Sequence, residues 1–375
     1  MSDKSVIVLG AGMVGRAMAI DLAKDFKVSS ADIDEAALKM VQANGVNPIK
    51  ADLSDADAIR DLVQDYDLVV GAVPGFLGFQ MMETVIDAGI NIVDISFYDE
   101  DPFRLDALAK EKGVTAVMDA GVAPGMDNVL LGYHAERMKV NRFECLVGGL
   151  PKERHWPYEY KAPFSPIDVL EEYTRPARIV ENGEMVVREA LSEPELIQFP
   201  NIGTLEAFNS DGLRTLVKTM DIPNMVERTL RYPGHIELMR VLRETGFFSK
   251  ERINIHGSEI RPIDMTSQLL FPKWKLGENE KEFTVMRVTI EGEENGKPKT
   301  YFYDLLDRYD AVSNTSSMSR TTGFTCTGVA RLIINGQYKH AGISPPEYIG
   351  KDENCFRTLL KHLEDRGVHY CATES

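Results

Sequence analysis

Hydrophobic and polar positions alternate regularly up to about Lys139. Short β-branched runs are separated by stretches in which apolar residues recur three or four positions apart, for example at 14–24 and 105–112. This alternation of strand-like and helix-like patterns is typical of βαβ units that build a parallel sheet. It predicts an α/β fold with a Rossmann-type, doubly wound domain over residues 1–125. The strands are expected at residues 6–9, 28–31, 46–50, 68–72, 90–95 and 114–118.

The pattern changes after this point. A strand-like segment at 143–147 precedes a loop rich in Pro, Trp and Tyr, and Asn-Gly pairs at Asn182-Gly183 and Asn295-Gly296 are flanked by extended, alternating sequence. Such pairs are strong signals for β-hairpins. Residues 126–310 are therefore predicted to form an α+β domain with a largely antiparallel sheet, and residues 311–375 to add helices at about 315–335 and 353–366.

Composition narrows the class of protein. With 375 residues, of which 43% are hydrophobic and 27% charged, the chain is expected to be globular, and it has no apolar run of the length that spans a bilayer. A net charge of −16 disfavours nucleic acid and anionic membranes as partners. The apolar run at 6–9 is too short for a signal peptide, so a cytoplasmic location is expected. The four cysteines form no Cys-x-x-Cys pair and the histidines lack zinc-site spacing, so we expect no metal.

A glycine-rich fingerprint directly follows the first predicted strand. Gly10, Gly12 and Gly15 lie in the sequence Gly-Ala-Gly-Met-Val-Gly, which also contains Met13 and Val14 and opens a predicted helix. In such a motif the first glycine allows a tight turn, the second admits a pyrophosphate, and the third lets helix pack on strand. The segment predicts dinucleotide binding. The alternative is a glycine turn in a packed α/β domain.

Asp32 ends the second predicted strand, where a carboxylate can accept hydrogen bonds from both hydroxyl groups of the adenosine ribose. A 2′-phosphate would meet Asp32, Asp34 and Glu35 with no cation before Lys39, so NAD is expected rather than NADP. The alternative role of Asp32 is a helix N-cap, for which Asp34 is equally suitable. Four residues that follow the third and fourth strands are expected near the cofactor or, equally, as ordinary loop residues: Asp52, Leu53, Val73 and Pro74.

Several segments beyond the fingerprint carry a resemblance to a known family. They are Asp94-Ile95-Ser96-Phe97-Tyr98, Gly121-Val122-Ala123-Pro124-Gly125-Met126-Asp127, Gly148-Gly149-Leu150-Pro151, Tyr160-Lys161 and Thr229-Leu230-Arg231-Tyr232-Pro233-Gly234-His235. Together they resemble the saccharopine dehydrogenase family over nearly the whole chain. Segments 172–178, 208–216 and 271–274 look most like its L-lysine 6-dehydrogenase branch. The resemblance implies NAD-dependent oxidative deamination of the lysine side-chain amine.

The resemblance also implies that the chain after about Ala311 returns to the dinucleotide domain and that the second domain contributes to a homodimer or larger homo-oligomer. Two departures separate the chain from the saccharopine reductase branch. Ala123 stands where that branch has an aspartate, and Asn209-Ser210-Asp211-Gly212 lacks an arginine that helps hold a tricarboxylate substrate. The loss of that arginine favours a smaller acid as substrate. Further cofactor contacts are implied for Ser96, Val122, Ala123, Pro124 and Ser165.

Oxidation of an amine needs groups that move protons beside the nicotinamide. The carboxyl ends of the fifth and sixth strands offer Asp94, Tyr98, Asp119 and Asp127. We favour Asp119, which could also be a strand-end residue bonded to backbone amides, whereas Asp127 is more simply a residue of a first helical turn. His235 is a second candidate base, because its ordinary pKa is near neutrality, or a satisfied loop histidine.

A substrate carboxylate needs a fixed cation, and Arg231 is the preferred candidate because guanidinium binds carboxylate bidentately. Arg175 and Arg320 are weaker choices. Asn209 and Asp211 are expected to receive the α-ammonium group. Other substrate contacts are expected from Phe97, Tyr160, Lys161 and Tyr232. The alternatives to lysine deamination are a reductase of the same family that makes saccharopine or a carboxylated polyamine, and a non-catalytic dinucleotide sensor.

Overall fold

The computed structural model describes residues 2–277 and 280–375. The chain divides into two compact units. Unit 1 comprises the residues up to Met138 together with Met318–His369, and unit 2 comprises Lys139–Ser317 and Tyr370–Ser375. These divisions differ from the predicted boundaries at 125/126 and 310/311. The helix that follows Gly125 packs within unit 1, and the last residues of the chain form a strand in the sheet of unit 2.

Unit 1 contains a parallel seven-stranded sheet with the order β17-β6-β5-β4-β1-β2-β3. The six predicted strands are all present, and their order is that of a Rossmann fold. The short strand β17 was not predicted, because two residues are too few to show a pattern. The strands are β1 Ser5–Leu9, β2 Lys27–Asp32, β3 Asn47–Lys50, β4 Leu68–Gly71, β5 Ile92–Asp94, β6 Thr115–Val117 and β17 Gly342–Ile343.

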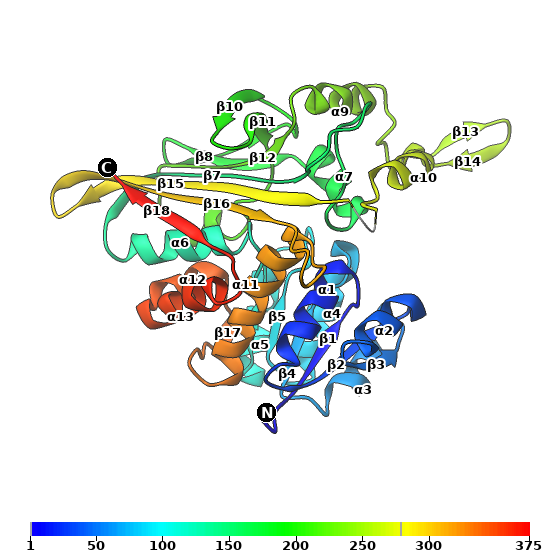
Figure 1. Cartoon of the computed structure of the whole chain (residues 1–375), viewed down its shortest axis with the longest axis vertical. Coiled ribbons are helices and arrows are strands. Elements are labelled where there is room, and N and C mark those ends of the chain that lie inside the picture. The colour runs from blue at the N-terminus through cyan, green and yellow to red at the C-terminus, as the bar shows by residue number, and fades with distance from the viewer. Residues whose placement is uncertain (1, 278–279) are drawn as a thin grey trace. The chain divides into compact units, whose positions relative to one another are not determined.

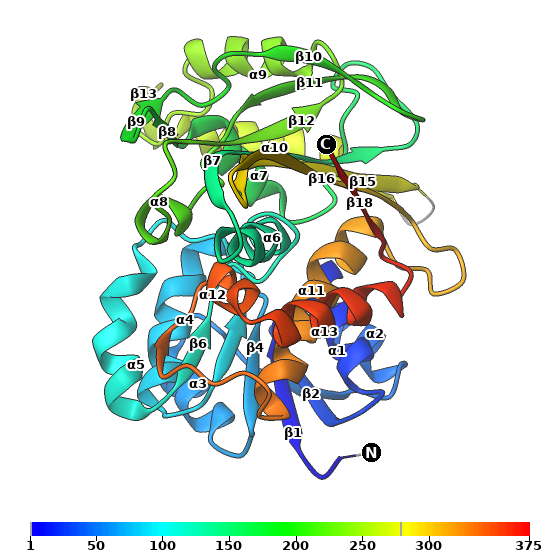
Figure 2. The same cartoon turned by 90° about the vertical axis from the view of Figure 1, so that its left-hand side faces the viewer.

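Helices cover both faces of this sheet: Figure 2 shows α1 and α2 on one side and α3, α4 and α5 on the other. Apolar strand residues are buried between them, as expected for a parallel sheet. The helices of unit 1 are α1 Met13–Leu22, α2 Glu35–Gln42, α3 Ala56–Val63, α4 Gly75–Asp87, η1 Pro102–Leu105, α5 Asp106–Lys112, α6 Met126–Ala135, α11 Ser317–Ile334 (from its second residue), α12 Pro346–Lys351 and α13 Glu353–Glu364.

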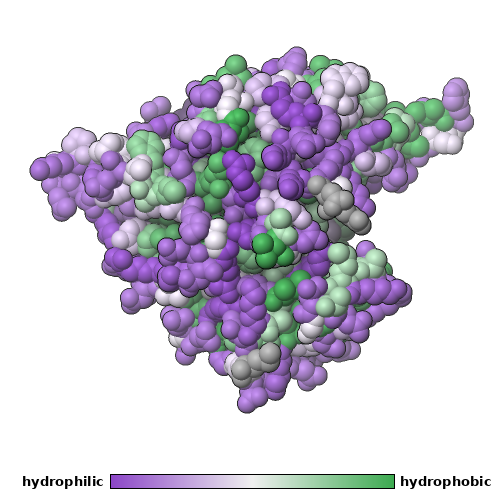
Figure 3. Space-filling view, in the orientation of Figure 1, coloured by the Kyte–Doolittle hydropathy of each residue, from purple (hydrophilic) through white to green (hydrophobic). Residues whose placement is uncertain are grey.

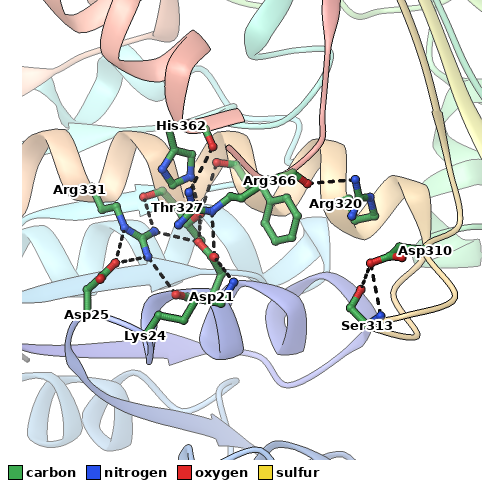
Figure 4. Close-up of polar contacts among 11 residues, drawn as sticks. Asp21, Lys24, Asp25, Asp310, Ser313, Arg320, Thr327, Arg331, His362 and Arg366 are labelled. Carbon is green, nitrogen blue, oxygen red and sulfur yellow. Dashed lines mark hydrogen bonds and ion pairs between the residues drawn. The ribbon is translucent and has the colours of Figure 1, made fainter. Parts of the chain in front are cut away.

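A buried ion cluster anchors the returning C-terminal segment to α1. Asp21 is only 1% exposed, and its carboxylate accepts hydrogen bonds from Arg331 of α11 and from Arg366, just after α13, each at 2.8 Å. Thr327 donates a third bond, also at 2.8 Å, and Figure 4 shows these side chains converging on Asp21. Burial opposes ionisation of Asp21, but the two arginines outweigh it and hold its pKa at about 2. This cluster ties the C-terminal segment to the dinucleotide fold.

Unit 2 contains a mixed sheet with the main order β10-β11-β12-β7-β15-β16-β18, and β8 pairs with both β12 and β9. Both hairpins predicted from Asn-Gly pairs are present, as β8–β9 and β15–β16. The pairing of β12 with β7 is parallel, and the rest of the sheet is antiparallel. The strands are β7 Lys139–Pro151, β8 Ala177–Glu181, β9 Glu184–Arg188, β10 Glu195–Phe199, β11 Gly203–Asn209, β12 Asn224–Arg231, β15 Glu282–Glu294, β16 Lys297–Arg308 and β18 Tyr370–Glu374.

Helices α7, α9 and α10 form a second layer of unit 2 (Figure 1). Their buried residues include Tyr173, Ile236 and Trp274, which belong to one apolar cluster. A separate hairpin of β13 and β14 lies between α9 and α10 in the chain. The elements of this layer are α7 Pro166–Thr174, α8 Leu216–Thr219, α9 His235–Glu244, β13 Ile253–Ile255, β14 Ser258–Ile260 and α10 Pro262–Trp274.

Most of the surface visible in Figure 3 is hydrophilic, in keeping with the charge of −16. Within residues 2–277 and 280–375, no helix combines the length and the apolar character needed to cross a membrane.

Candidate functional site

Each glycine of the fingerprint has a distinct steric reason in the structure. A Cβ at Gly10 would lie 2.4 Å from the carbonyl oxygen of Ala72, and Gly10 has φ +111°, so this turn requires glycine. A Cβ at Gly15 would lie 2.1 Å from the carbonyl oxygen of Gly10, so α1 packs closely on the turn. At Gly12 a Cβ would meet nothing within 4 Å. The second glycine therefore leaves open space above the turn, which is what a bound pyrophosphate needs.

The start of α1 provides a partial positive charge that complements a phosphate. Gly12 is the N-cap of α1 and has no side chain to bond the N–H groups of the first turn. Met13 follows and is 36% exposed. Unbonded amides at a helix start, together with the helix dipole, favour an anion. The turn and the helix therefore fit a dinucleotide phosphate.

Asp32 supports the same turn from the end of β2. Its carboxylate accepts hydrogen bonds from the N–H of Ala11 at 2.6 Å and from the N–H of Asp34 at 2.9 Å. Asp34, and not Asp32, is the N-cap of α2, because its side chain accepts from the N–H of Ala36 at 2.8 Å. The structure thus removes the N-cap alternative for Asp32 and leaves its carboxylate beside the fingerprint.

A cation also lies at this end of the sheet, where a 2′-phosphate was predicted to meet no cation before Lys39. Lys50 of β3 is the register partner of Asp32. Its Nζ is 2.5 Å from Oε1 of Glu35, and both side chains are more than half exposed. Spacing along the chain does not reveal this cation, because it does not show which residues neighbouring strands bring together.

The four residues predicted after the third and fourth strands lie at the carboxyl ends of β3 and β4, as expected. Asp52 accepts hydrogen bonds from the side chain and the N–H of Ser54, at 2.7 and 3.0 Å, which lower its pKa. Leu53 packs against the core of unit 1. Val73 is buried, and Pro74 is the N-cap of α4.

Two carboxylates and a serine come together at the ends of β5 and β6. Asp94 is fully buried, and its Oδ1 accepts a hydrogen bond from the Ser96 hydroxyl at 2.8 Å. Its Oδ2 has no hydrogen-bond partner among the described residues. Burial raises the pKa of Asp94 to about 7, and the neighbouring charge of Asp119 adds to the effect against the hydrogen bonds from Ser96. Asp119 itself is 3% exposed and has φ +52°, a backbone conformation unusual for aspartate.

The structure thus brings together three predicted residues, Asp94, Ser96 and Asp119, where a parallel sheet binds its ligand. A carboxyl group with a pKa near neutrality can take up or release a proton there. The site depends on a glycine that sequence analysis did not single out. A Cβ at Gly71 would lie 2.1 Å from Oδ1 of Asp94, so only glycine leaves room for this carboxylate.

Other candidates near these strand ends have structural roles. Asp127 accepts a hydrogen bond from the N–H of Gly125 at 2.8 Å and so holds the loop that contains Val122, Ala123 and Pro124. The side chain of Tyr98 belongs to the apolar core, where its hydroxyl lies 3.4 Å from the Met82 sulfur. A role in proton transfer is therefore not supported for Tyr98. The alternation of strand residues did not reveal its direction, because it lies beyond the end of β5. Phe97 before it is partly exposed.

In unit 2, Arg231 ends β12 and lies at the centre of a buried aromatic cluster. The arginine is 2% exposed. Its Nε donates to the Tyr173 hydroxyl at 2.9 Å, its Nη1 donates to the carbonyl oxygen of Leu230 at 2.9 Å, and its Nη2 forms an ion pair with Glu172. The Tyr160 ring lies 4.5 Å from the guanidinium carbon, within cation–π range. The charge of Arg231 is thus fixed in place by its neighbours.

His235 lies in the same cluster but is not poised as a base. Its Nδ1 is 2.8 Å from the carbonyl oxygen of Tyr158, so this nitrogen carries the proton and donates it. Its Nε2, 2.9 Å from the Tyr173 hydroxyl, accepts. Burial, followed by the charge of Arg231, lowers the pKa of His235 to about 3. The histidine stays neutral and orients Tyr173 toward Arg231, which favours the satisfied-histidine alternative.

Two polar groups of the cluster have no hydrogen-bond partner among the residues that the structure describes. They are the hydroxyl of Tyr160, a residue only 3% exposed, and the indole Nε1 of Trp274, which is fully buried. The two rings meet edge to face with centroids 5.5 Å apart. Buried donors without partners are rare and often mark a place for a ligand or water.

The two residues expected to receive the α-ammonium group have other side-chain partners in the structure. Asp211 accepts two hydrogen bonds from the guanidinium of Arg178, both at 2.8 Å. Asn209 donates to Ser192 and Glu193. Both side chains are therefore engaged within unit 2. Sequence analysis could not foresee these partners because they lie 16 to 33 residues away.

The remaining residues that were predicted to contact substrate or cofactor each have separate contacts. Lys161 lies 3.3 Å from Glu280, and the Tyr232 hydroxyl donates to the carbonyl oxygen of Pro151 at 2.9 Å. Ser165 directly precedes α7. Arg175 lies near Glu171 on α7, and Arg320 donates to carbonyl groups after α13.

Sequence analysis missed three members of the Arg231 cluster: Glu172, Tyr173 and Trp274. All lie in segments that carried the family resemblance, but no spacing pattern linked them to Arg231. In the described part of the chain, no group of His, Cys, Asp and Glu side chains is arranged to hold a metal ion.

Two family patterns match the chain in succession. The Saccharopine dehydrogenase NADP binding domain matches residues 6–117, and the Saccharopine dehydrogenase C-terminal domain matches residues 121–368. The chain belongs to the saccharopine dehydrogenase family. Residues 6–117 of unit 1 thus match the dinucleotide-binding domain of the family, and the predicted resemblance is confirmed at the level of the family.

Relatives within the saccharopine dehydrogenase family have several activities by name. The chain is 24% identical to a mitochondrial alpha-aminoadipic semialdehyde synthase of Mus musculus, over 98% of this chain and 47% of that protein. It is 28% identical to a saccharopine dehydrogenase [NADP(+), L-glutamate-forming] of Pyricularia oryzae, over 67% of this chain and 59% of that protein. The chain therefore spans about half the length of these relatives. A carboxynorspermidine synthase of Vibrio cholerae is 22% identical over 93% of both chains.

A solved structure shows the same fold. The apo saccharopine dehydrogenase (L-Glu forming) of Saccharomyces cerevisiae matches with a TM-score of 0.78 and 19% identity, over 99% of this chain and 100% of that chain. The α/β architecture predicted from the sequence is thereby confirmed. Members of this family are oxidoreductases that act on CH–NH groups with NAD or NADP.

Proposed function

We propose that this protein is an NAD-dependent L-lysine 6-dehydrogenase. The side-chain carbon that bears the amine loses a hydride, the resulting imine takes up water, and ammonium is released. The products are allysine, ammonium, NADH and a proton. Allysine then cyclises by attack of its own α-amine on the aldehyde, with loss of water.

The observation that carries the proposal is the composition of the Arg231 cluster. Among its described members, which are Tyr160, Glu172, Tyr173, Arg231, His235 and Trp274, Arg231 is the only cation, because His235 is neutral. One fixed guanidinium suits a substrate with one carboxylate. Saccharopine carries three carboxylates and would need further cations. This supports lysine over the larger substrates that other family members take.

Asp32 supports NAD as the cofactor. Its carboxylate accepts a hydrogen bond from the N–H of Ala11 and so lies beside the fingerprint. There it can accept hydrogen bonds from the hydroxyl groups of the adenosine ribose. Lys50 is engaged by Glu35 and so offers a 2′-phosphate less compensation than an unpaired lysine would. When bound, NAD supplies the hydride acceptor. The main-chain amides at the start of α1 and the Asp32 carboxylate hold it.

Asp119 and Asp94 are the proposed proton-handling groups. The amine must lose a proton before oxidation, and water must lose one when it attacks the imine. Asp119 is the proposed acceptor. Burial raises the pKa of Asp94 to about 7, so that carboxyl is partly protonated near neutral pH and the pair carries less than two negative charges.

One other activity has specific support. Two relatives from Vibrio are named carboxynorspermidine synthase, which favours, as the alternative, a reductase that joins an amine to an aldehyde. A reductase of this type remains the second candidate for this chain, with saccharopine or a carboxylated polyamine as product.

The test is NADH formation by the purified protein with L-lysine and NAD at mildly alkaline pH, with NADP in parallel and a chemical trap for the cyclic imine. We expect NADH and trapped product with NAD. A second assay supplies an aldehyde, a primary amine and NADH or NADPH. Oxidation of NADH or NADPH in that assay, without NADH formation in the first, would show that the protein is the reductase and not the dehydrogenase. NAD binding without turnover in either assay would indicate a sensor.

A further inference from the structure

The ion pair between Glu172 and Arg231 joins two elements of unit 2 at the buried aromatic cluster. Resting on the proposed function, we propose that this pair recognises the zwitterionic head of an α-amino acid. In this assignment the carboxylate binds Arg231, and the α-ammonium group binds Glu172. Glu172 thereby determines specificity for α-amino acids over amines and ω-amino acids that lack the α-ammonium group.

The hydrogen bonds of Arg231 leave it able to take a carboxylate. A guanidinium has five N–H donors. Three are used by Tyr173, Leu230 and Glu172, on Nε, Nη1 and Nη2 respectively. Two N–H donors of Arg231 are therefore left, one on each terminal nitrogen. A carboxylate can bridge both terminal nitrogens of an arginine.

Glu172 is the accessible member of the pair. Its side chain is 20% exposed, whereas that of Arg231 is 2% exposed. One oxygen, Oε2, faces Arg231. A ligand that arrives at this pair therefore meets the carboxylate of Glu172 together with the remaining donors of Arg231. Opposite charges placed side by side match the two charged groups on the α-carbon of an amino acid.

The unpartnered groups of the same cluster point independently to a ligand. The Tyr160 hydroxyl is buried without a hydrogen-bond partner, and the Tyr160 ring lies against the Arg231 guanidinium at 4.5 Å. The indole Nε1 of Trp274 is also buried without a partner. A carboxylate beside Arg231 would supply an acceptor that these donors lack. A pair that served only to neutralise charge would not account for them.

The neighbouring hydrogen bonds fix the geometry of the pair. His235 accepts from the Tyr173 hydroxyl, whose oxygen accepts from Nε of Arg231. Because His235 donates its other proton to the carbonyl oxygen of Tyr158, the direction of this chain of bonds is determined. Tyr173 and His235 are therefore positioning residues for Arg231, and they leave its terminal nitrogens for the ligand.

The test compares L-lysine with two analogues, 6-aminohexanoate, which lacks the α-ammonium group, and 1-aminopentane, which lacks both the α-ammonium group and the carboxylate. The variants are Glu172→Gln and a control, Glu171→Gln. Glu171 is the adjacent residue of α7, its side chain is 18% exposed, and it pairs with Lys250 and not with Arg231. Each ratio of kcat/KM values is taken within one protein preparation, so loss of folded protein does not affect it.

We expect Glu172→Gln to reduce the preference for L-lysine over 6-aminohexanoate at least tenfold, and Glu171→Gln to change it less than twofold. The preference for 6-aminohexanoate over 1-aminopentane should persist in both variants, because these two compounds differ only in the carboxylate that contacts Arg231. An unchanged preference for L-lysine in Glu172→Gln would overturn the assignment.

Calorimetric binding of L-lysine and 6-aminohexanoate in the presence of NAD separates this inference from the proposed function. If the protein oxidises no lysine but prefers to bind it, and Glu172→Gln loses that preference, the function is wrong and the recognition pair stands. If the unaltered protein binds both compounds equally or binds neither, the recognition pair is wrong.

Discussion

The candidate sites of the two units bury charged groups in opposite ways. In unit 1, Asp94 and Asp119 lie at adjacent strand ends, and burial raises the pKa of Asp94 to about 7. In unit 2, Arg231 is held by an anion, a hydroxyl, a carbonyl group and aromatic rings, and His235 beside it is neutral. The first arrangement makes protonation responsive near neutral pH. The second fixes a charge that does not titrate. A proton-transfer site and a binding site can thus be distinguished by whether buried charges are compensated.

The largest effect is expected from removing the fixed charge of unit 2. Arg231→Ala leaves Glu172 without its cation and removes the centre of the aromatic cluster, so we expect a loss of about 3–5 kcal/mol in the free energy of unfolding. Denaturant unfolding measures it. The control is Arg188→Ala. Arg188 pairs with Glu181, and their side chains are 34% and 41% exposed, so this ion pair should contribute less than about 1 kcal/mol to the free energy of unfolding. Equal losses of unfolding free energy in the two variants would contradict the view that Arg231 is a buried, compensated charge on which the stability of unit 2 depends.

The next effect concerns proton transfer in unit 1. Asp119→Asn keeps the shape of the side chain and removes its basicity, so kcat for lysine oxidation should fall about 100-fold or more. The dissociation constant of NAD, measured by fluorescence titration, should change far less. Asp57→Asn on the surface helix α3, where the side chain is 88% exposed, serves as the control. Unchanged turnover in Asp119→Asn would remove this residue from the mechanism.

The pH dependence of stability tests the buried carboxyl directly. The pKa of Asp94 is raised in the folded protein to about 7 from an ordinary value of 3.8. Between these values the folded state keeps a proton that the unfolded chain has lost, so Asp94 makes the protein less stable as pH rises from about 4 to 7. Asp94→Asn should remove this penalty and raise the free energy of unfolding at pH 8, relative to the unaltered protein, by about 2 kcal/mol or more.

The same comparison at pH 4.5 should show a much smaller gain for Asp94→Asn, because Asp94 is then protonated in the folded protein at little cost. Urea unfolding at the two pH values supplies the measurement. A gain of equal size at both would mean that protonation of Asp94 is not its cause.

The smallest effect is expected at the cofactor site. Asp32→Asn retains an oxygen that can accept from Ala11 but removes the charge that opposes a 2′-phosphate, so the preference for NAD over NADP should fall about tenfold. Steady-state kcat/KM values with both cofactors measure it. Asp34→Asn is the matched control, because asparagine caps a helix as well as aspartate does. A preference that moves equally in both variants would argue against a specific role for Asp32.

Local patterns predicted most of the fold, because strand periodicity, the glycine fingerprint and the Asn-Gly turns each act over a few residues. The six strands of the dinucleotide sheet and both hairpins are present. Strands β17 and β18 were missed. They join their sheets through partners distant in the chain, so their own sequences carry little signal.

The candidate site was predicted less completely. Asp94, Ser96 and Asp119 follow neighbouring strands and were brought together as expected, because topology places parallel strand ends side by side. The side-chain partners of Asn209 and Asp211 were not foreseen, and Glu172 was missed, because side-chain pairing in unit 2 depends on contacts between elements that no local pattern encodes. Lys50 beside Asp32 is a further example.

The most direct test of the proposed activity follows the side-chain nitrogen. The protein is incubated with NAD and L-lysine labelled with nitrogen-15 at the side-chain amine, and the products are observed by NMR. The account predicts labelled ammonium and an unlabelled cyclic imine, since the ring then contains only the α-nitrogen. Label retained in the cyclic product would show oxidation at the α-carbon, and the absence of labelled ammonium would contradict the account.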